Sequence, residues 1–290
     1  MYTPKPEWLR LRYHHSEESQ QVEKLLKKLN LNTVCRQALC PNHAECFGRK
    51  TATFMILGIH CTRNCRFCNV SYAKPQPVDA DEPQRIGEAV ACLGLKYVVV
   101  TSVTRDDLPD GGASHFAAVI RSIREKSPDT VIEVLIPDLQ GNLNALKSIS
   151  EAVPDVISHN VETVPRLYDT VRPQANYLRS LSIIKNISIE GCSTRSKSGL
   201  MLGLGEKWEE VLSVLEDLRA VGCSFITLGQ YLAPSFDHHP VVEYIHPDMF
   251  DKYAEAARTL GFEHVASGPL VRSSYHADQA VQPRSTKVCF

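Results

Sequence analysis

The 290-residue sequence contains no run of about 18 apolar residues, which a transmembrane helix would need. Its opening segment, MYTPKPEWLRLRYHH, lacks the continuous apolar stretch of a secretory signal. The formal net charge is only −1, so no overall basic field points to nucleic acid. Internal repeats and low-complexity tracts are also absent. We therefore expect a cytoplasmic globular protein that binds neither nucleic acid nor a membrane.

What the sequence does have is cysteine, with ten residues in a chain that shows no secretory signal. A disulfide framework would suit a small secreted protein, and this chain is not one. Six of the ten fall in two tight clusters, Cys35-x4-Cys40-x5-Cys46 and Cys61-x3-Cys65-x2-Cys68. In a reducing cytosol such clusters indicate metal or iron–sulfur ligation.

The middle of the chain alternates short apolar runs with segments of helical periodicity. The runs are almost continuously apolar, as strands covered on both faces would be. They lie at 51–59, 97–103, 131–137, 156–163, 200–205, 225–232 and 264–270. Helical spacing is clearest at 116–123, 208–215 and 250–257, and glycines that would end helices stand at 94, 222 and 261. Roughly six strand–helix units and a last strand predict an α/β protein with a parallel sheet, closed as a partial (β/α)6-type TIM barrel.

Three regions follow from this pattern. Residues 1–50 form an N-terminal extension with one amphipathic helix around 22–29 and the first-occurring cysteine cluster. Residues 51–271 form the barrel. Residues 272–290 form a C-terminal segment whose polar, aperiodic tail, 279–290, we expect to be frayed.

Cys61, Cys65 and Cys68 offer three thiols where a closed metal site needs four ligands. Three thiolates on a short loop can bind three irons of a [4Fe–4S] cube and leave the fourth iron open, whereas structural zinc takes four protein ligands. A zinc knuckle completed by His60 is the alternative, although a chain of this size needs no metal staple. Cys61 closely follows the first strand, so the motif would lie at the barrel mouth, where reactive groups of such barrels gather.

The upstream cluster, Cys35, Cys40 and Cys46, is also a three-thiol set. By itself it is compatible with a zinc loop that uses His43. Two such sets so close together favour two iron–sulfur clusters. The remaining cysteines need no ligand role: two, at 92 and 223, are expected to be small core residues, and two, at 192 and 289, lie in a predicted loop and the tail.

The CxxxCxxC motif after a first barrel strand, with Phe67 before its last cysteine, resembles the radical S-adenosylmethionine (SAM) enzymes. Together with CxxxxCxxxxxC upstream, the chain resembles the lipoyl synthase family of that group. The resemblance runs over nearly the whole chain and departs from the commonest motif only at Asn64 and Arg66, which are not ligand positions. Its segments are KPEWLR, CPNHAECF, TATFMILG, TSVTRDDLPDGGASHF, SHNVETV, KSGLMLGLGE, LGQYLAPSFDHHPV and SGPLVRSSYHA.

This resemblance implies a sulfurtransferase of lipoate biosynthesis and protein lipoylation. It inserts two sulfur atoms, at C6 and C8, into an octanoyl chain carried on a lysine of another protein. The implied cofactors are two [4Fe–4S] clusters, with SAM as co-substrate. One cluster would cleave SAM to a 5′-deoxyadenosyl radical, and the auxiliary cluster would give up its sulfides to the product. The cofactors would carry the hard chemistry, and the protein would bind and orient them.

The resemblance also implies roles for individual residues. Cys35, Cys40 and Cys46 would hold the auxiliary cluster with a serine of the RSSY motif, which aligns to Ser274 with Ser273 as the alternative. Contacts with SAM would come from Thr101, Asn160, Glu162, Arg172, Ser198, Leu200 and Met201. The acidic loop 106–112 keeps an open role. His239 and His246 are weak candidates that ordinary turns would explain.

Implied partners are octanoylated lipoyl domains, such as E2 subunits or the glycine-cleavage H protein. An electron donor such as ferredoxin or flavodoxin and an iron–sulfur cluster carrier are also implied. The nearest rival enzymes are sulfur-inserting relatives of the biotin synthase or methylthiotransferase type, which CxxxxCxxxxxC and RSSY disfavour. The rival outside enzymes is a two-cluster electron carrier or a zinc-binding interaction module, which has little use for a barrel.

Overall fold

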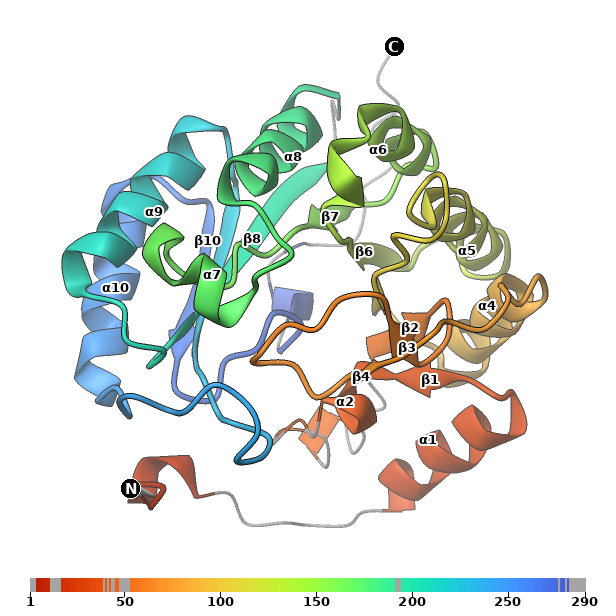
Figure 1. The fold of residues 1–290 in the computed structure, drawn as a ribbon. Coiled ribbons are helices and arrows are strands. Elements are labelled where there is room, and N and C mark those ends of the chain that lie inside the picture. The colour runs from red at the N-terminus through yellow and green to blue at the C-terminus, as the bar shows by residue number, and fades with distance from the viewer. Residues whose placement is uncertain are drawn as a thin grey trace.

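The computed structural model describes residues 4–10, 17–38, 40, 42, 45–46, 53–190, 194–275, 277–279 and 281. Its centre is an eight-stranded sheet in the order β1-β2-β5-β6-β7-β8-β9-β10. Strands β2 to β10 of this sheet run parallel, and β1 pairs antiparallel with β2 at one end. The sheet curves into an open barrel with helices on its outer face (Figure 1). The predicted partial barrel is confirmed.

The strands β2 and β5 to β9 are mostly buried, as their apolar runs predict, whereas β10 is half-buried. The strands of this sheet are β1 (Asn32–Thr33), β2 (Thr53–Ile56), β5 (Tyr97–Ser102), β6 (Val131–Leu135), β7 (Val156–Ser158), β8 (Arg195–Leu202), β9 (Phe225–Gln230) and β10 (His264–Gly268). A separate two-stranded sheet joins β3 (His60–Cys61) and β4 (Ser71–Tyr72). Strand β8 begins well before the predicted run 200–205, because its first half is polar and shows no apolar signal.

Helices α4 to α10 follow the strands and pack one after another around the barrel (Figure 1). They are α4 (Glu82–Leu93), α5 (Ala113–Lys126), α6 (Leu143–Ser150), α7 (Tyr168–Val171), α8 (Tyr177–Glu190), α9 (Trp208–Ala220) and α10 (Pro247–Thr259). The helices predicted from periodicity lie within α5, α9 and α10. In the described part of the chain, no helix combines the length and apolar character needed to cross a bilayer.

The two ends of the chain add short elements beside the barrel. Before β2 come η1 (Glu7–Leu9), α1 (Glu17–Lys28), which is the predicted amphipathic helix, and α2 (Val34–Gln37). Short 3-10 turns also occur at η2 (Leu139–Gly141), η3 (Pro165–Leu167) and η4 (Ala277–Gln279). Most of the tail predicted to be frayed lies outside the described residues. Cys192 and Cys289 lie outside them as well.

Two expectations about core cysteines have different outcomes. Cys223 is fully buried, as predicted. Cys92 is exposed, so its predicted core position is wrong. The buried face of α4 is formed by Ile86, Ala89 and Val90. Cys92 comes six residues after Ile86, which at 3.6 residues per turn places it about a third of a turn around the helix from Ile86.

A charged group lies buried among the strands. Lys197 Nζ lies 2.9 and 3.0 Å from the two carboxylate oxygens of Glu133, and Tyr97 donates its hydroxyl hydrogen to the same carboxylate (2.5 Å). Lys197 is 2% exposed and Glu133 is not exposed at all. Burial, together with the Glu133 charge, raises the pKa of Tyr97, which therefore stays a hydrogen-bond donor.

Replacement of Lys197 by Met should destabilise the protein by about 3–5 kcal/mol, because Glu133 would remain buried without its counter-charge. Chemical unfolding of the metal-free protein measures this loss. Arg195→Ala is the matched control on the same strand, since its ion pair with Glu263 is half exposed and contributes about 0–1 kcal/mol. Equal stability of the two variants would contradict the assignment.

Candidate functional site

One cavity of about 1110 Å³ brings both cysteine clusters together inside the barrel. The N-terminal extension and the loop after β2 each contribute three thiols to its lining: Cys35, Cys40, Cys46, Cys61, Cys65 and Cys68. Among the described residues, no three His, Cys, Asp or Glu side chains converge closely enough to hold a single metal ion. Two three-thiol sets spread around one cavity fit iron–sulfur clusters better than a compact zinc site.

The start of the CxxxCxxC loop is bonded to the loop after β5. The N–H and the hydroxyl of Thr62 both donate to Thr104 O (3.0 Å each), and Asp106 N–H donates back to Thr62 Oγ1 (3.1 Å). The Cys61 sulfur accepts from the N–H groups of Arg63 (3.4 Å) and Thr104 (3.3 Å). These two N–H groups hold the Cys61 sulfur in position at the cavity wall.

The middle of the loop is bonded to the segment that follows β7. Asn64 N–H donates to the side-chain oxygen of Gln174 (2.6 Å), and Arg66 N–H donates to Val171 O (2.8 Å). Asn64 and Arg66 are the positions at which the motif departs from the commonest form. Both contacts use backbone N–H groups, so neither contact requires a particular side chain at these positions.

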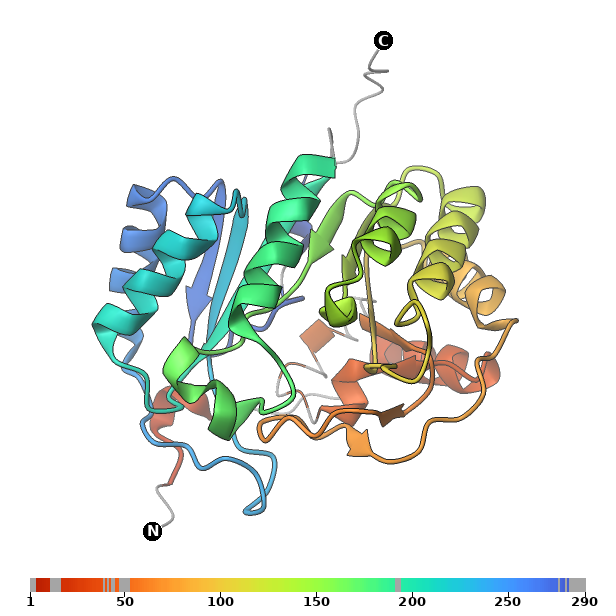
Figure 2. The same cartoon turned by 45° about the horizontal axis from the view of Figure 1, so that its top comes forward.

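The end of the loop is held by the segment after β9. His239 N–H donates to Arg66 O (2.8 Å), and His238 Nε2 donates to Cys68 O (3.2 Å). Figure 2 shows the loop after β2 (orange) and the loop after β9 (light blue) at the same end of the barrel. His239 therefore supports the cysteine loop, a role that the sequence did not reveal.

Arg63 makes the strongest of these connections. Its guanidinium forms a two-point pair with Asp106 (2.6 and 2.8 Å) and a further contact with Asp138 (2.7 Å). Burial opposes ionisation of Asp138, but the hydrogen bond and charge of Arg63 outweigh it and lower the pKa of Asp138 to about 2. Asp106 begins the acidic loop 106–112, to which the sequence assigned no role. One function of that loop is to bind the Arg63 guanidinium.

Four of the six thiols lie in surroundings that disfavour free thiolates. Burial raises the pKa of Cys35 and Cys65 to about 11 and that of Cys68 to about 12, and it also raises the pKa of Cys40. A bound cationic metal reverses this preference, because the ligand form of cysteine is the thiolate. Loading of the site therefore releases protons.

The C-terminal segment is tied to the upstream cysteine cluster. Asn42, which is 2% exposed, donates its side-chain N–H to Leu270 O (2.8 Å). The Tyr275 hydroxyl donates to the Glu45 carboxylate (3.0 and 3.1 Å). Residues more than two hundred positions apart are thus clasped together.

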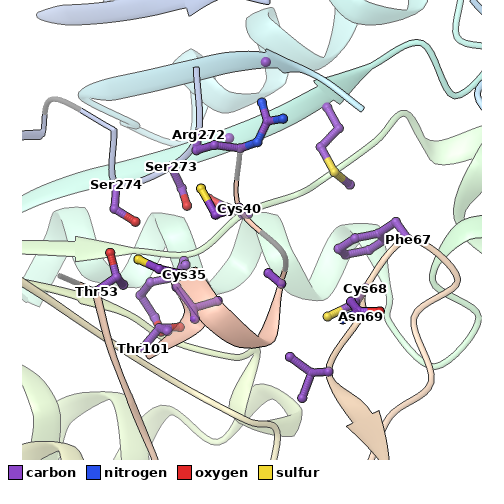
Figure 3. Close-up of a pocket in the computed structure, with 18 of the residues that line it drawn as sticks. Cys35, Cys40, Thr53, Phe67, Cys68, Asn69, Thr101, Arg272, Ser273 and Ser274 are labelled. Atoms are coloured by element: carbon purple, nitrogen blue, oxygen red, sulfur yellow. The ribbon is translucent and has the colours of Figure 1, made fainter. Parts of the chain in front are cut away.

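These contacts bring the RSSY serines to the thiols. Ser273 and Ser274 both line the cavity. Figure 3 shows them gathered with Cys35 and Cys40 on one side of the pocket, while Cys68 lies across from them. Both hydroxyls are near the upstream thiol set, so either could supply an oxygen ligand to a metal held there.

Asn160, Glu162 and Arg172 meet on the wall that follows β7, and all three line the cavity. Within the described part of the chain, Asn160 Oδ1 and Arg172 Nε are buried and have no hydrogen-bond partner. Burial raises the pKa of Glu162, while the Arg172 charge opposes that change. Glu162 also has a φ of 67°, which is uncommon outside glycine. Unsatisfied polar groups and backbone strain of this kind are typical of a ligand site.

The other residues predicted to contact SAM differ in whether they line the cavity. Thr101, Leu200 and Met201 line the cavity, although the Thr101 hydroxyl already donates to Leu135 O (3.0 Å). Ser198 is fully buried, is not part of the lining, and its hydroxyl accepts a backbone N–H (3.3 Å). The predicted contact of Ser198 with SAM stays a prediction, and Ser198 lies behind the lining residues.

Three further histidines were candidate zinc ligands or site residues: His60, His43 and His246. His60 does not line the cavity that its neighbour Cys61 lines. His43 lies outside the described residues. His246 caps helix α10 through a contact with Asp248 N–H (3.4 Å), as an ordinary turn residue would.

Comparison with known proteins agrees with this site. Residues 55–218 match the family model of the radical SAM superfamily. A lipoyl synthase of Caldicellulosiruptor saccharolyticus is 58% identical over 282 residues, covering 97% of this chain and 99% of the relative. A lipoyl synthase of Nitrosomonas eutropha is 53% identical over 276 residues, covering 95% and 88%.

Solved structures with a similar fold are distant in sequence. Methylornithine synthase has a TM-score of 0.52 at 12% identity, covering 92% of this chain and 88% of its own. A maturase of the [FeFe]-hydrogenase has a TM-score of 0.55 at 14% identity, covering 86% and 68%. These likenesses show the fold, and the sequence relatives show the narrower group. The chain belongs to the radical SAM superfamily and, within it, to the lipoyl synthase family.

Proposed function

We propose that this chain is a lipoyl synthase that inserts two sulfur atoms, at C6 and C8, into an octanoyl chain carried on a lysine of another protein. The observation that carries the proposal is the convergence of two three-thiol sets on one cavity. An enzyme that only generates a radical needs one such set. The second set gives the cavity a place for a sulfur source beside the place where SAM would bind.

The loop after β2 would hold the first cluster through Cys61, Cys65 and Cys68. When bound, the clusters and SAM supply the electron, the 5′-deoxyadenosyl radical and the sulfides that the reaction requires. The protein presents three thiols, which would ligate three irons of a bound cluster and leave the fourth for SAM. Hydrogen bonds from the neighbouring segments would hold this loop in place.

The wall after β7 would orient SAM. Asn160 Oδ1 can accept a hydrogen bond from a ribose hydroxyl or the amino group, and the Glu162 carboxylate can accept two. Arg172 places a positive charge beside them, although two of its contacts go to backbone oxygens of Asn160 (2.9 Å) and Val161 (3.0 Å). Its unpartnered Nε remains free to meet a carboxylate. Leu200 and Met201 would pack against adenine, and Thr101 would contribute a hydroxyl.

The N-terminal extension and the C-terminal segment would hold the auxiliary cluster together. Cys35, Cys40 and Cys46 supply thiolates, and Ser274, or Ser273, supplies an oxygen. Serine is a weaker ligand than a fourth cysteine, which suits a cluster that must surrender sulfides. The Asn42–Leu270 hydrogen bond keeps that serine beside the thiols.

The three proposed regions divide this work between them. Residues 1–50 and 272–290 would serve the auxiliary cluster, and residues 51–271 the radical chemistry. The substrate would be an octanoylated lipoyl domain, such as that of an E2 subunit, or the glycine-cleavage H protein. Ferredoxin or flavodoxin would supply electrons, and a cluster carrier would rebuild the consumed cluster. We place the enzyme in the cytoplasm.

The decisive test separates the two thiol sets. Anaerobic reconstitution should give about eight irons per chain for two [4Fe–4S] clusters. Cys65→Ala should lose about half of the iron and all formation of 5′-deoxyadenosine. Cys40→Ala should lose the other half, keep 5′-deoxyadenosine formation, and add no sulfur to an octanoylated peptide. Iron counting and mass spectrometry measure both.

Wild-type protein that cleaves SAM but leaves the peptide without sulfur would refute lipoyl synthesis and keep the radical reaction.

Ser274→Ala should impair the auxiliary cluster alone. We expect at least a tenfold loss of sulfur insertion, with SAM cleavage retained, because only the oxygen ligand is removed. Ser273→Ala is the matched control one residue away. If Ser273→Ala shows the loss and Ser274→Ala does not, the alternative serine is the ligand.

Gly199→Ala should weaken SAM binding. A Cβ there would lie 2.6 Å from Thr227 Oγ1 and 3.0 Å from Asn160 Oδ1, so Asn160 must shift. We expect the dissociation constant for SAM to rise about tenfold, or about 1.4 kcal/mol. Gly268→Ala is the control, since its Cβ would have no neighbour closer than 3.4 Å. Equal affinities in equilibrium dialysis would argue against Asn160 as a contact.

A further inference from the structure

Arg63 is a buried cation inside the CxxxCxxC loop that no ligand role explains. Its side chain is 6% exposed, and its charge meets carboxylates from two separate strand-end loops. Asp106 belongs to the loop after β5, and Asp138 belongs to the loop after β6. The guanidinium therefore joins three loops at one point beside Cys61 and Cys65.

We propose that Arg63 is a positioning residue that orients the cysteine loop so that the open iron of the first cluster faces Asn160, Glu162 and Arg172. The inference rests on the proposed function, because it assumes that SAM binds at that iron. Arg63 would not touch SAM. It would act through the loop, by fixing the direction in which the three thiols point.

The geometry requires an arginine. Nε and Nη2 take the two oxygens of Asp106, and Nη2 also reaches Asp138 (2.7 Å). A planar guanidinium makes these contacts from one plane, whereas a lysine ammonium is a point charge on a flexible stem. Arg179, on α8, adds a second positive charge 3.3 Å from Asp138. Two cations and two carboxylates thus balance one another.

The loop after β6 is itself held in place by this network. Asp138 Oδ1 also accepts the N–H of Gln140 (3.1 Å), and the Gln140 side chain donates to Asp106 O (3.3 Å). Leu139 and Gln140 have φ values of 46° and 52°, which are strained for residues other than glycine. The surrounding hydrogen bonds hold this strained backbone, so Arg63 contacts a loop that is itself tied to the loop after β5.

A stability effect must be separated from a positioning effect. Loss of Arg63 alone would leave Asp138, whose side chain is not exposed, with the longer contact to Arg179 (3.3 Å) and the N–H of Gln140 (3.1 Å). Arg63→Met combined with Asp138→Asn removes both the cation and the stranded carboxylate. Folding should then recover, while the connection between the cysteine loop and the β6 loop stays broken.

The control is a similar pair outside the cavity. Arg124, on α5, forms a 2.9 Å ion pair with Asp155 and also donates to two backbone oxygens. Arg124→Met combined with Asp155→Asn removes a comparable bridge between elements. It should change the melting temperature and leave SAM binding at the wild-type level.

The experiment uses full-length, anaerobically reconstituted protein. We measure melting temperature, bound iron, the dissociation constant for SAM, and the change that SAM causes in the electron paramagnetic resonance (EPR) spectrum of the reduced protein. The Arg63/Asp138 double variant should melt within a few degrees of the control and bind SAM at least tenfold more weakly, with a reduced spectral change. Arg63→Lys, which keeps the charge, should bind SAM with intermediate affinity.

Wild-type affinity and an unchanged spectral response in both Arg63 variants would overturn the proposal. Wild-type protein whose spectrum does not respond to SAM would overturn it together with the proposed function. Wild-type protein that responds to SAM but adds no sulfur to the peptide would overturn lipoyl synthesis alone. The positioning role of Arg63 would then stand.

Discussion

A short loop with three metal-binding thiols and no fourth ligand cannot close a site by itself. In this protein the loop's shape depends on hydrogen bonds from outside it. Segments after β5, β6, β7 and β9 all contribute, because parallel strands in a barrel deliver their carboxyl ends to one mouth. The barrel therefore defines the conformation of the cysteine loop, because it brings these hydrogen-bonding segments to the same place.

The buried charges also constrain the positions of the segments that carry them. Arg63 with its two aspartates stands beside the first thiol set, and Lys197 with Glu133 lies among the strands. Each pair is costly to bury and costlier to break, so each constrains the geometry around it. Apolar packing would stabilise the barrel equally well, but it would not fix loop directions as closely.

The upstream thiol set, Cys35, Cys40 and Cys46, depends on contacts between the two ends of the chain. Two hydrogen bonds hold the RSSY segment against the upstream cysteines. One joins Asn42 to Leu270, and the other joins Tyr275 to Glu45. Partly exposed hydrogen bonds of this kind open more easily than a packed core. Such a clasp suits a site whose contents would be consumed and rebuilt.

The sequence by itself determined the barrel and the six clustered thiols, because apolar runs and cysteine spacing are local signals. It was also correct about Cys223, Gly94 and the helices in α5, α9 and α10. It misplaced Cys92, because the side of a helix on which a residue falls depends on the phase of the helix, which only its packing reveals. Only the tertiary structure showed the contacts of Arg63, Asp138, His238 and His239. Their partners are distant in sequence, and a hydrogen bond between distant loops leaves no periodic pattern to read.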